Sequence, residues 1–146
     1  MYEILQAKKY FELIIKNYSD TEYAQDSKYK LELIVEIMAS KGMYLARYYV
    51  QREKWIPAIN RFKNDVNDYE TTIYVEEGLH RLVELHYNIG LTSEAQNYAS
   101  ILGYNYQSSQ WYEESYKIFN KDYKKKRKKP GNDKNGLLTK FKNLFK

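Results

Sequence analysis

Hydrophobic residues recur at spacings of three and four along most of the chain, and strand-like alternation is nowhere sustained. This period is typical of amphipathic helices, because such positions share one helical face. The clearest stripes are Ile4, Ala7, Phe11 and Ile14; Ile56, Ile59, Phe62 and Val66; and Val75, Leu79, Leu82, His86 and Ile89. Another stripe stays in phase across Gly42, which predicts one long helix from about Asp26 to Arg52. The pattern therefore predicts an all-α fold.

Three segments of the chain repeat the same series of residues. They start at Ala7, Ala58 and Ala95, and each reaches a Tyr eleven positions on and a Ser or Thr fourteen positions on. The Ser or Thr is expected to cap the N-terminus of the next helix. The last two segments are 37 residues apart, close to the helix–turn–helix unit of about 34 residues in tetratricopeptide (TPR) repeats. We therefore predict a TPR-like solenoid of antiparallel helix pairs.

Particular side chains have predicted places in this repeat. Ala58 and Ala95 are expected where paired helices approach closely, with Phe62 beside Ala58. Gly90 and residues 53–55 are expected to form the tight turns within the pairs. The recurring tyrosines at positions 18, 69 and 106 are predicted to pack in the core. A helix over residues 108–123 is predicted to cap the last repeat.

Charge divides the chain into two parts. Residues 1–116 carry a net charge of −5, whereas residues 117–146 carry +10. The predicted domains are accordingly a repeat domain over 1–123, a basic linker over 124–136 and a short amphipathic helix over 137–146. That last helix is too short to be stable alone.

The basic tail has several possible roles. It is either a solvated linker, a contact for anionic lipid head groups with two phenylalanines inserted, or a contact for a protein partner. The residues in question are Lys124, Lys125, Lys126, Arg127, Lys128, Lys129, Phe141 and Phe145. Nucleic acid is not an expected partner, because the acidic body offers no continuous basic face that follows phosphates.

Signals for catalysis, metals and cofactors are weak throughout. The chain has no cysteine, and its histidines, His80 and His86, are six positions apart instead of the four that place two ligands on one helical face. Adjacent glutamates at 76–77 and 113–114 point about 100° apart on a helix and are predicted to be solvated helix starts. No apolar run approaches the roughly 20 residues of a membrane span. We expect neither an enzyme nor a cofactor.

Three stretches of the chain carry a resemblance to a known family. They are YA at 23–24, ARYYVQREKWIPAINRFKNDVNDYETT at 46–72 and GLTSEAQNYASILGYNY at 90–106. Over about residues 4–112 the chain resembles the BamD family, the TPR lipoproteins of the bacterial outer-membrane β-barrel assembly machinery. Members carry a secretion signal, a lipidated cysteine and two further repeats, so the chain is expected to be the C-terminal portion of such a protein.

The resemblance implies a function and a location. It implies a non-catalytic scaffold at the periplasmic face of the outer membrane. This scaffold would dock to the barrel-forming subunit BamA and help deliver outer-membrane protein clients. The family's partner-facing arginine falls in the pair Asn60–Arg61. The residues themselves leave an alternative, an ion pair from Arg61 to Asp65 within the same helix.

A second function also stays open. A generic TPR adaptor would bind a peptide or a chain terminus in its concave groove. The inner helical face would offer Tyr48, Tyr49 and Arg52 for that purpose. Tyrosine suits such a surface because its apolar ring ends in a polar hydroxyl.

Overall fold

The computed structural model describes residues 2–120, and every element in that range is a helix. The helices are α1 (Tyr2–Asn17), α2 (Glu22–Gln51), α3 (Trp55–Asp68), α4 (Val75–Asn88), α5 (Thr92–Asn105) and α6 (Gln110–Phe119). The predicted all-α fold is therefore confirmed. The predicted linker over 124–136 and the predicted helix over 137–146 lie outside the described residues.

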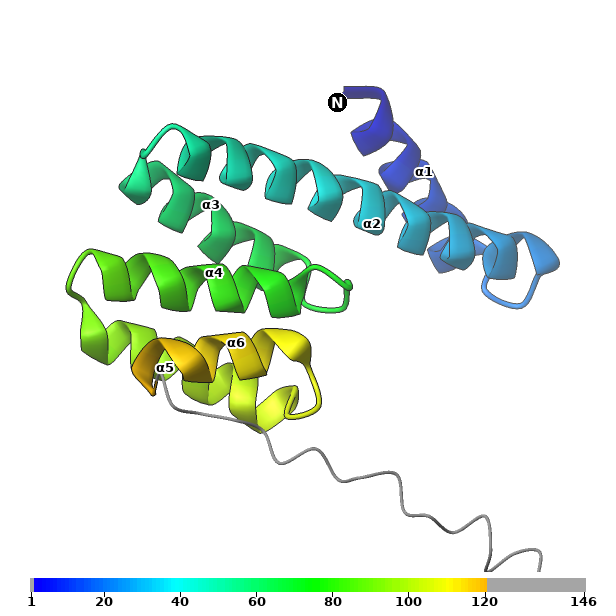
Figure 1. Cartoon of the computed structure of the whole chain (residues 1–146). Coiled ribbons are helices and arrows are strands. Elements are labelled where there is room, and N and C mark those ends of the chain that lie inside the picture. Colours follow the sequence, from blue (N-terminus) through cyan, green and yellow to red (C-terminus); the bar gives the residue numbers. More distant parts are fainter. Residues whose placement is uncertain (1, 121–146) are drawn as a thin grey trace, which may run out of the picture.

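The helices stack as antiparallel pairs (Figure 1). The long α2 packs on α1 and on α3, α4 packs on α3, α5 and α6, and α5 also packs on α6. Each new helix thus covers a face of the preceding ones, which is the arrangement of a helical-repeat solenoid. The predicted TPR-like fold is confirmed.

Helix α2 is a single helix of 30 residues, longer than the other described helices. Thr21 caps its N-terminus by accepting a hydrogen bond from the Ala24 N–H. The helix passes Gly42 without a break, as the in-phase stripe predicts. Glycine at this point allows a close approach, since a Cβ there would lie 2.1 Å from the Asp65 Oδ1 of α3.

The turns between pairs repeat at the atomic level. The N–H groups of Thr21, Thr72 and Ser109 donate to the carbonyls of Tyr18, Tyr69 and Tyr106 at 3.1, 3.1 and 3.0 Å. Thr21 and Ser109 then cap the following helices, as predicted. The prediction is wrong for Thr72, because α4 begins three residues later and no side chain caps its first turn. The Thr72 hydroxyl donates to the Tyr69 carbonyl, as the Thr21 hydroxyl does to the Tyr18 carbonyl.

The turns inside the pairs also match each other. Glu53 and Gly90, 37 positions apart, both have positive φ, at 55° and 88°. The next N–H in each turn closes it, from Lys54 to the Tyr49 carbonyl and from Leu91 to the His86 carbonyl. Glycine adopts this left-handed conformation without a steric penalty, whereas Glu53 adopts it at some cost.

The core lies around α3 and α4. The first core cluster comprises Met43, Ala46, Ala58, Ile59, Phe62, Leu82 and Leu85, and the second core cluster comprises Val75, Leu79 and Leu102. Ala58 and Ala95 are fully buried, as their predicted places require. Tyr106 packs on the second core cluster and Tyr69 is half-buried, but Tyr18 is 59% exposed, so the core prediction is wrong for that tyrosine.

No helix within residues 2–120 is both long enough and apolar enough to cross a lipid bilayer.

Candidate partner-binding site

The first group of predicted site residues lies at the C-terminal end of α2. Tyr48 is 41% exposed, and the Arg52 guanidinium lies 5.1 Å from the centre of its ring, within cation–π range. Tyr49 packs edge-on against Tyr48 at 6.0 Å but belongs to the border of the first core cluster. Tyr48 and Arg52 therefore form an exposed surface, while Tyr49 supports it from the core.

The second group lies on α3. The buried face of this helix comprises Ala58, Ile59, Phe62 and Asp65. Asn60 is exposed and Arg61 is half-buried at the border of that face. Within the described part of the chain, no hydrogen bond or ion pair engages the Arg61 guanidinium, and the predicted alternative of an Arg61–Asp65 ion pair is wrong. The guanidinium keeps its five donors for other partners.

Asp65 is instead a buried carboxylate. The residue is 7% exposed, its carboxyl lies against Gly42 of α2, and its Oδ2 atom has no hydrogen-bond partner. Burial raises the pKa of this carboxyl to about 6, because low-dielectric surroundings disfavour the charged form. The charge of Arg61 lowers that pKa and the charge of Asp68 raises it. Arg61 thus acts on Asp65 through space without contacting it.

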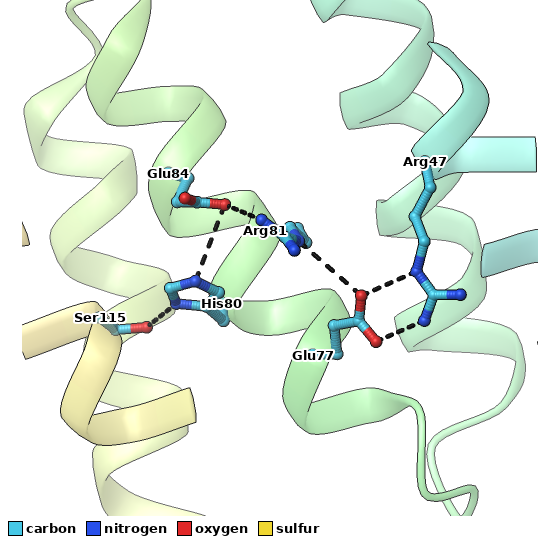
Figure 2. A network of polar contacts seen from close by, with 6 residues as sticks. All are labelled: Arg47, Glu77, His80, Arg81, Glu84 and Ser115. Carbon is cyan, nitrogen blue, oxygen red and sulfur yellow. Dashed lines mark hydrogen bonds and ion pairs between the residues drawn. The ribbon is translucent and has the colours of Figure 1, made fainter. Parts of the chain in front are cut away.

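A network of polar contacts joins α2, α4 and α6 (Figure 2). Arg47 of α2 donates two hydrogen bonds to Glu77 of α4, with the Nε–Oε1 distance at 2.8 Å. Arg81 lies between two carboxylates: its Nη1 donates to Glu84 at 2.6 Å, and its Nε is 3.8 Å from Glu77. The hydrogen bond to Glu77 raises the pKa of the Arg47 guanidinium.

The network continues from α4 to α6 through a buried histidine. The His80 Nδ1 lies 2.8 Å from the Ser115 Oγ, and its Nε2 lies 3.7 Å from Glu84. Its ring packs against Trp111 at 5.2 Å. Burial lowers the pKa of His80, while the charge of Glu84 opposes this shift. The imidazole is therefore a neutral contact between α4 and α6.

The sequence gives no sign of this network. Their positions on the chain predict Glu76 and Glu77 as solvated, but the Glu77 side chain is only 13% exposed and Glu76 accepts a hydrogen bond from Ser109. These partners are 30 and 33 residues away, so helical spacing gives no sign of them. Each carboxylate already has a cationic or hydroxyl partner, and the network fixes the helices relative to one another.

No group of three or more His, Asp and Glu side chains in residues 2–120 is placed to hold a metal ion. The predicted site residues offer a guanidinium on α3, unpaired within residues 2–120, and a cation–aromatic pair on α2. Both are features through which proteins bind other proteins.

Comparison with known proteins decides the family. A family model described as YfiO, outer membrane lipoprotein, matches residues 1–102, which is more than half of the chain. The chain belongs to the YfiO family. The resemblance to BamD proteins is confirmed with it, because curated relatives carry the name outer membrane protein assembly factor BamD.

Two of these relatives define the extent of the similarity. The one from Rickettsia prowazekii is 40% identical over 112 residues, covering 77% of this chain and 45% of the relative. The one from Caulobacter vibrioides is 36% identical over 107 residues, covering 73% of this chain and 35% of the relative. The chain thus spans less than half the length of either.

The YfiO match has a clear boundary on the structure. It contains both groups of candidate site residues, together with Arg47, Glu77 and Arg81 of the polar network. Helix α6 lies beyond residue 102 and outside the match. The His80–Ser115 contact therefore joins a family-typical helix to a helix outside the family match.

Proposed function

We propose that the chain is a non-catalytic scaffold in outer-membrane protein assembly, working at the periplasmic face of the outer membrane. Membership of the YfiO family and the name of its BamD relatives, outer membrane protein assembly factor, support this role. A stack of helix pairs suits it, since such folds present extended surfaces for partners. Clients of the machinery are unfolded outer-membrane proteins in this proposal, and the docking partner is a BamA-like barrel-forming subunit.

Arg61 is the residue proposed to carry the docking. It stands on a helix beside a fully buried core residue, Phe62, yet no ion pair engages it within residues 2–120. A guanidinium in this position pairs with a partner carboxylate through two parallel hydrogen bonds. Asn60, exposed beside it, offers an amide for further hydrogen bonds. This unpaired guanidinium is the observation that carries the proposal.

The test compares two charge reversals with equal change in charge. Arg61→Glu is expected to weaken binding to the periplasmic domains of a BamA-like partner by about 2 kcal/mol or more, through lost pairing and new repulsion. Lys28→Glu, on an exposed position in the first half of α2, is the matched control and should leave affinity nearly unchanged. Lys28→Glu should unfold like the wild type. Arg61→Glu loses the through-space attraction to Asp65, so circular dichroism at the temperature of the titration checks that this variant is folded.

Titration calorimetry with the purified domains gives the affinities. If Arg61→Glu and Lys28→Glu bind with the same affinity as the wild type, Arg61 is not part of the docking surface.

The adaptor function has one observation in its favour. Tyr48 and Arg52 form an exposed cation–aromatic pair, a combination suited to an extended peptide or a chain terminus. Arg52→Glu distinguishes the two functions. It should abolish capture of a peptide in the adaptor case and leave the Arg61-dependent affinity intact in the scaffold case.

A further inference from the structure

A stripe of exposed apolar side chains runs along one face of α2. It comprises Tyr29, Leu33, Ile37, Tyr44 and Tyr48, which are between 41% and 70% exposed. At about 100° per residue, these five positions lie within about 100° of one another around the helix. The buried residues of α2 lie on its opposite side. Proteins rarely leave a long continuous apolar surface uncovered, so the stripe indicates an interaction surface.

The stripe is accessible along the first half of α2. Figure 1 shows this half extending beyond α3 and α4. A hollow of about 640 Å³ lies beside it, lined by residues of α2 between Tyr29 and Glu36 and by Thr71 and Thr72 of the turn between α3 and α4. Its lining combines the apolar Leu33 with the carboxylates of Glu32 and Glu36. Such a hollow suits a tyrosine from another molecule, because the ring is apolar and the hydroxyl donates a hydrogen bond.

The stripe is symmetric about its own centre. Leu33 lies four residues after Tyr29, and Tyr44 lies four residues before Tyr48. Two copies of α2 can therefore lie antiparallel with the centres of residues 29–48 together. Tyr29 of each copy then faces Tyr48 of the other, and Leu33 faces Tyr44. One face thus serves both copies, as a two-fold symmetric interface requires.

The charges of α2 are complementary in the same arrangement. Residues 22–36 carry four acidic and two basic side chains, a net charge of −2, whereas residues 37–52 carry three basic side chains and no acidic one, a net charge of +3. The helix dipole favours this order only in the first and last turns, and Glu32, Glu36 and Lys41 lie well inside the helix. An antiparallel second copy places each acidic half on a basic half, whereas a parallel copy would place like charges together.

We propose that the chain forms a two-fold symmetric dimer in which α2 of one copy lies antiparallel along α2 of the other. The second copy covers the stripe, and its Tyr44 enters the hollow beside Leu33. Asp26 lies three residues before Tyr29 and Arg52 lies four residues after Tyr48, so Asp26 of each copy faces Arg52 of the other. This inference goes beyond the proposed assembly function and does not depend on it.

Analytical ultracentrifugation of the whole chain over a range of concentrations tests the dimer. We expect the mass to rise towards twice the chain mass of 17.6 kDa as the concentration increases. Leu33→Asp should raise the dissociation constant about tenfold or more, because it places a charge from each copy in the apolar contact. Leu13→Asp is the matched control. It changes an exposed leucine of α1 in the same way and should leave the dissociation constant unchanged.

A charge exchange tests the antiparallel arrangement. Asp26→Arg places two arginines opposite each other at both ends of the dimer, and Arg52→Asp places two carboxylates there. Each variant alone should therefore dimerise more weakly than the wild type. An equal mixture of the two variants should recover the wild-type affinity, because each residue 26 then faces an opposite charge at residue 52 of the other copy. In a parallel dimer, each variant alone would associate as the wild type does.

The outcomes that would overturn the proposal are distinct. A mass that stays at 17.6 kDa at every concentration excludes the dimer. An affinity that Leu33→Asp leaves unchanged excludes the stripe as the interface. A mixture of the charge variants that associates no better than either variant alone excludes the antiparallel pairing. All four substituted side chains are exposed, so every variant should keep the helical circular dichroism of the wild type.

Discussion

Helices α1 and α4 have similar lengths, 16 and 14 residues, but very different surroundings. Helix α1 has no buried residue and packs on α2, whereas α4 has eight buried residues and packs on α3, α5 and α6. Both have apolar positions at helical spacing. The number of sides on which a helix has neighbours therefore decides how much it contributes to the core. The spacing of its own apolar positions matters less.

The largest difference in stability is expected between variants that remove two equivalent phenylalanines, one in the core and one on α1. Phe62 of α3 and Phe11 of α1 occupy the same place in the repeat, but Phe62 is fully buried and Phe11 is partly exposed, 5.8 Å from the Lys30 ammonium. Phe62→Ala should lower the free energy of unfolding by about 3–5 kcal/mol, through lost burial and a cavity. Phe11→Ala should cost about 1 kcal/mol or less.

Urea unfolding followed by circular dichroism measures both variants. Equal losses would show that α1 contributes to the cooperative core as strongly as α3 does.

The buried carboxylate of Asp65 gives the stability of the core a pH dependence. The pKa of Asp65 is raised by burial from 3.8 to about 6 in the folded state. Between these values the folded state binds a proton that the unfolded state has lost, so stability falls as pH rises through the window. The loss should reach about 2–3 kcal/mol above pH 6 and should be absent in Asp65→Asn.

His80 acts with the opposite sign and needs a control. Burial lowers its pKa below 6.5, so the unfolded state binds that proton first and stability falls as pH drops through this range. Wild type and Asp65→Asn both contain His80, so the difference between their unfolding free energies at each pH isolates Asp65. A difference that is constant with pH would mean that Asp65 is ionised and solvated in the folded state.

A smaller effect is expected from overpacking. Ala58 is fully buried where α3 meets α2, and Ala7 is its partly exposed equivalent on α1. Ala58→Leu should destabilise the chain by about 1–3 kcal/mol, because extra methyl groups force the helices apart. Ala7→Leu should have almost no effect. Thermal unfolding compares the two variants. An unchanged melting temperature for Ala58→Leu would show that the contact between α3 and α2 has room for a larger side chain.

Local features of the fold were predictable from the sequence. Periodicity predicts the helices, and the recurring Tyr and Ser or Thr predict the turns, because both depend on neighbours within a few residues. The long helix is predicted over about 26–52 and observed over 22–51. The prediction that Tyr18 lies in the core is wrong because of tertiary packing. Its turn has the same local hydrogen bond as the other turns, but the side chain is left exposed.

The polar contacts between helices were not predictable in the same way. Arg47 and Glu77 are 30 residues apart, and only the packing of α2 near α4 brings them together. Asp65 did leave a sign in the sequence. It is an acidic residue three positions after Phe62 and next to Val66, within an apolar stripe, while Gly42 lies within another stripe. A carboxylate and a glycine at such positions indicate a close contact between helices.

The continuity of α2 has a mechanical consequence. Its 30 residues form a rod about 45 Å long, held by α1 along its first half and by α3 along its second. No turn separates the two halves, so a sideways force on α1 acts as a torque on the second half. The contacts that resist this torque include the Gly42–Asp65 approach and the Arg47–Glu77 ion pair. A sideways force applied to α1 is thereby transmitted through α2 to the buried carboxylate of Asp65.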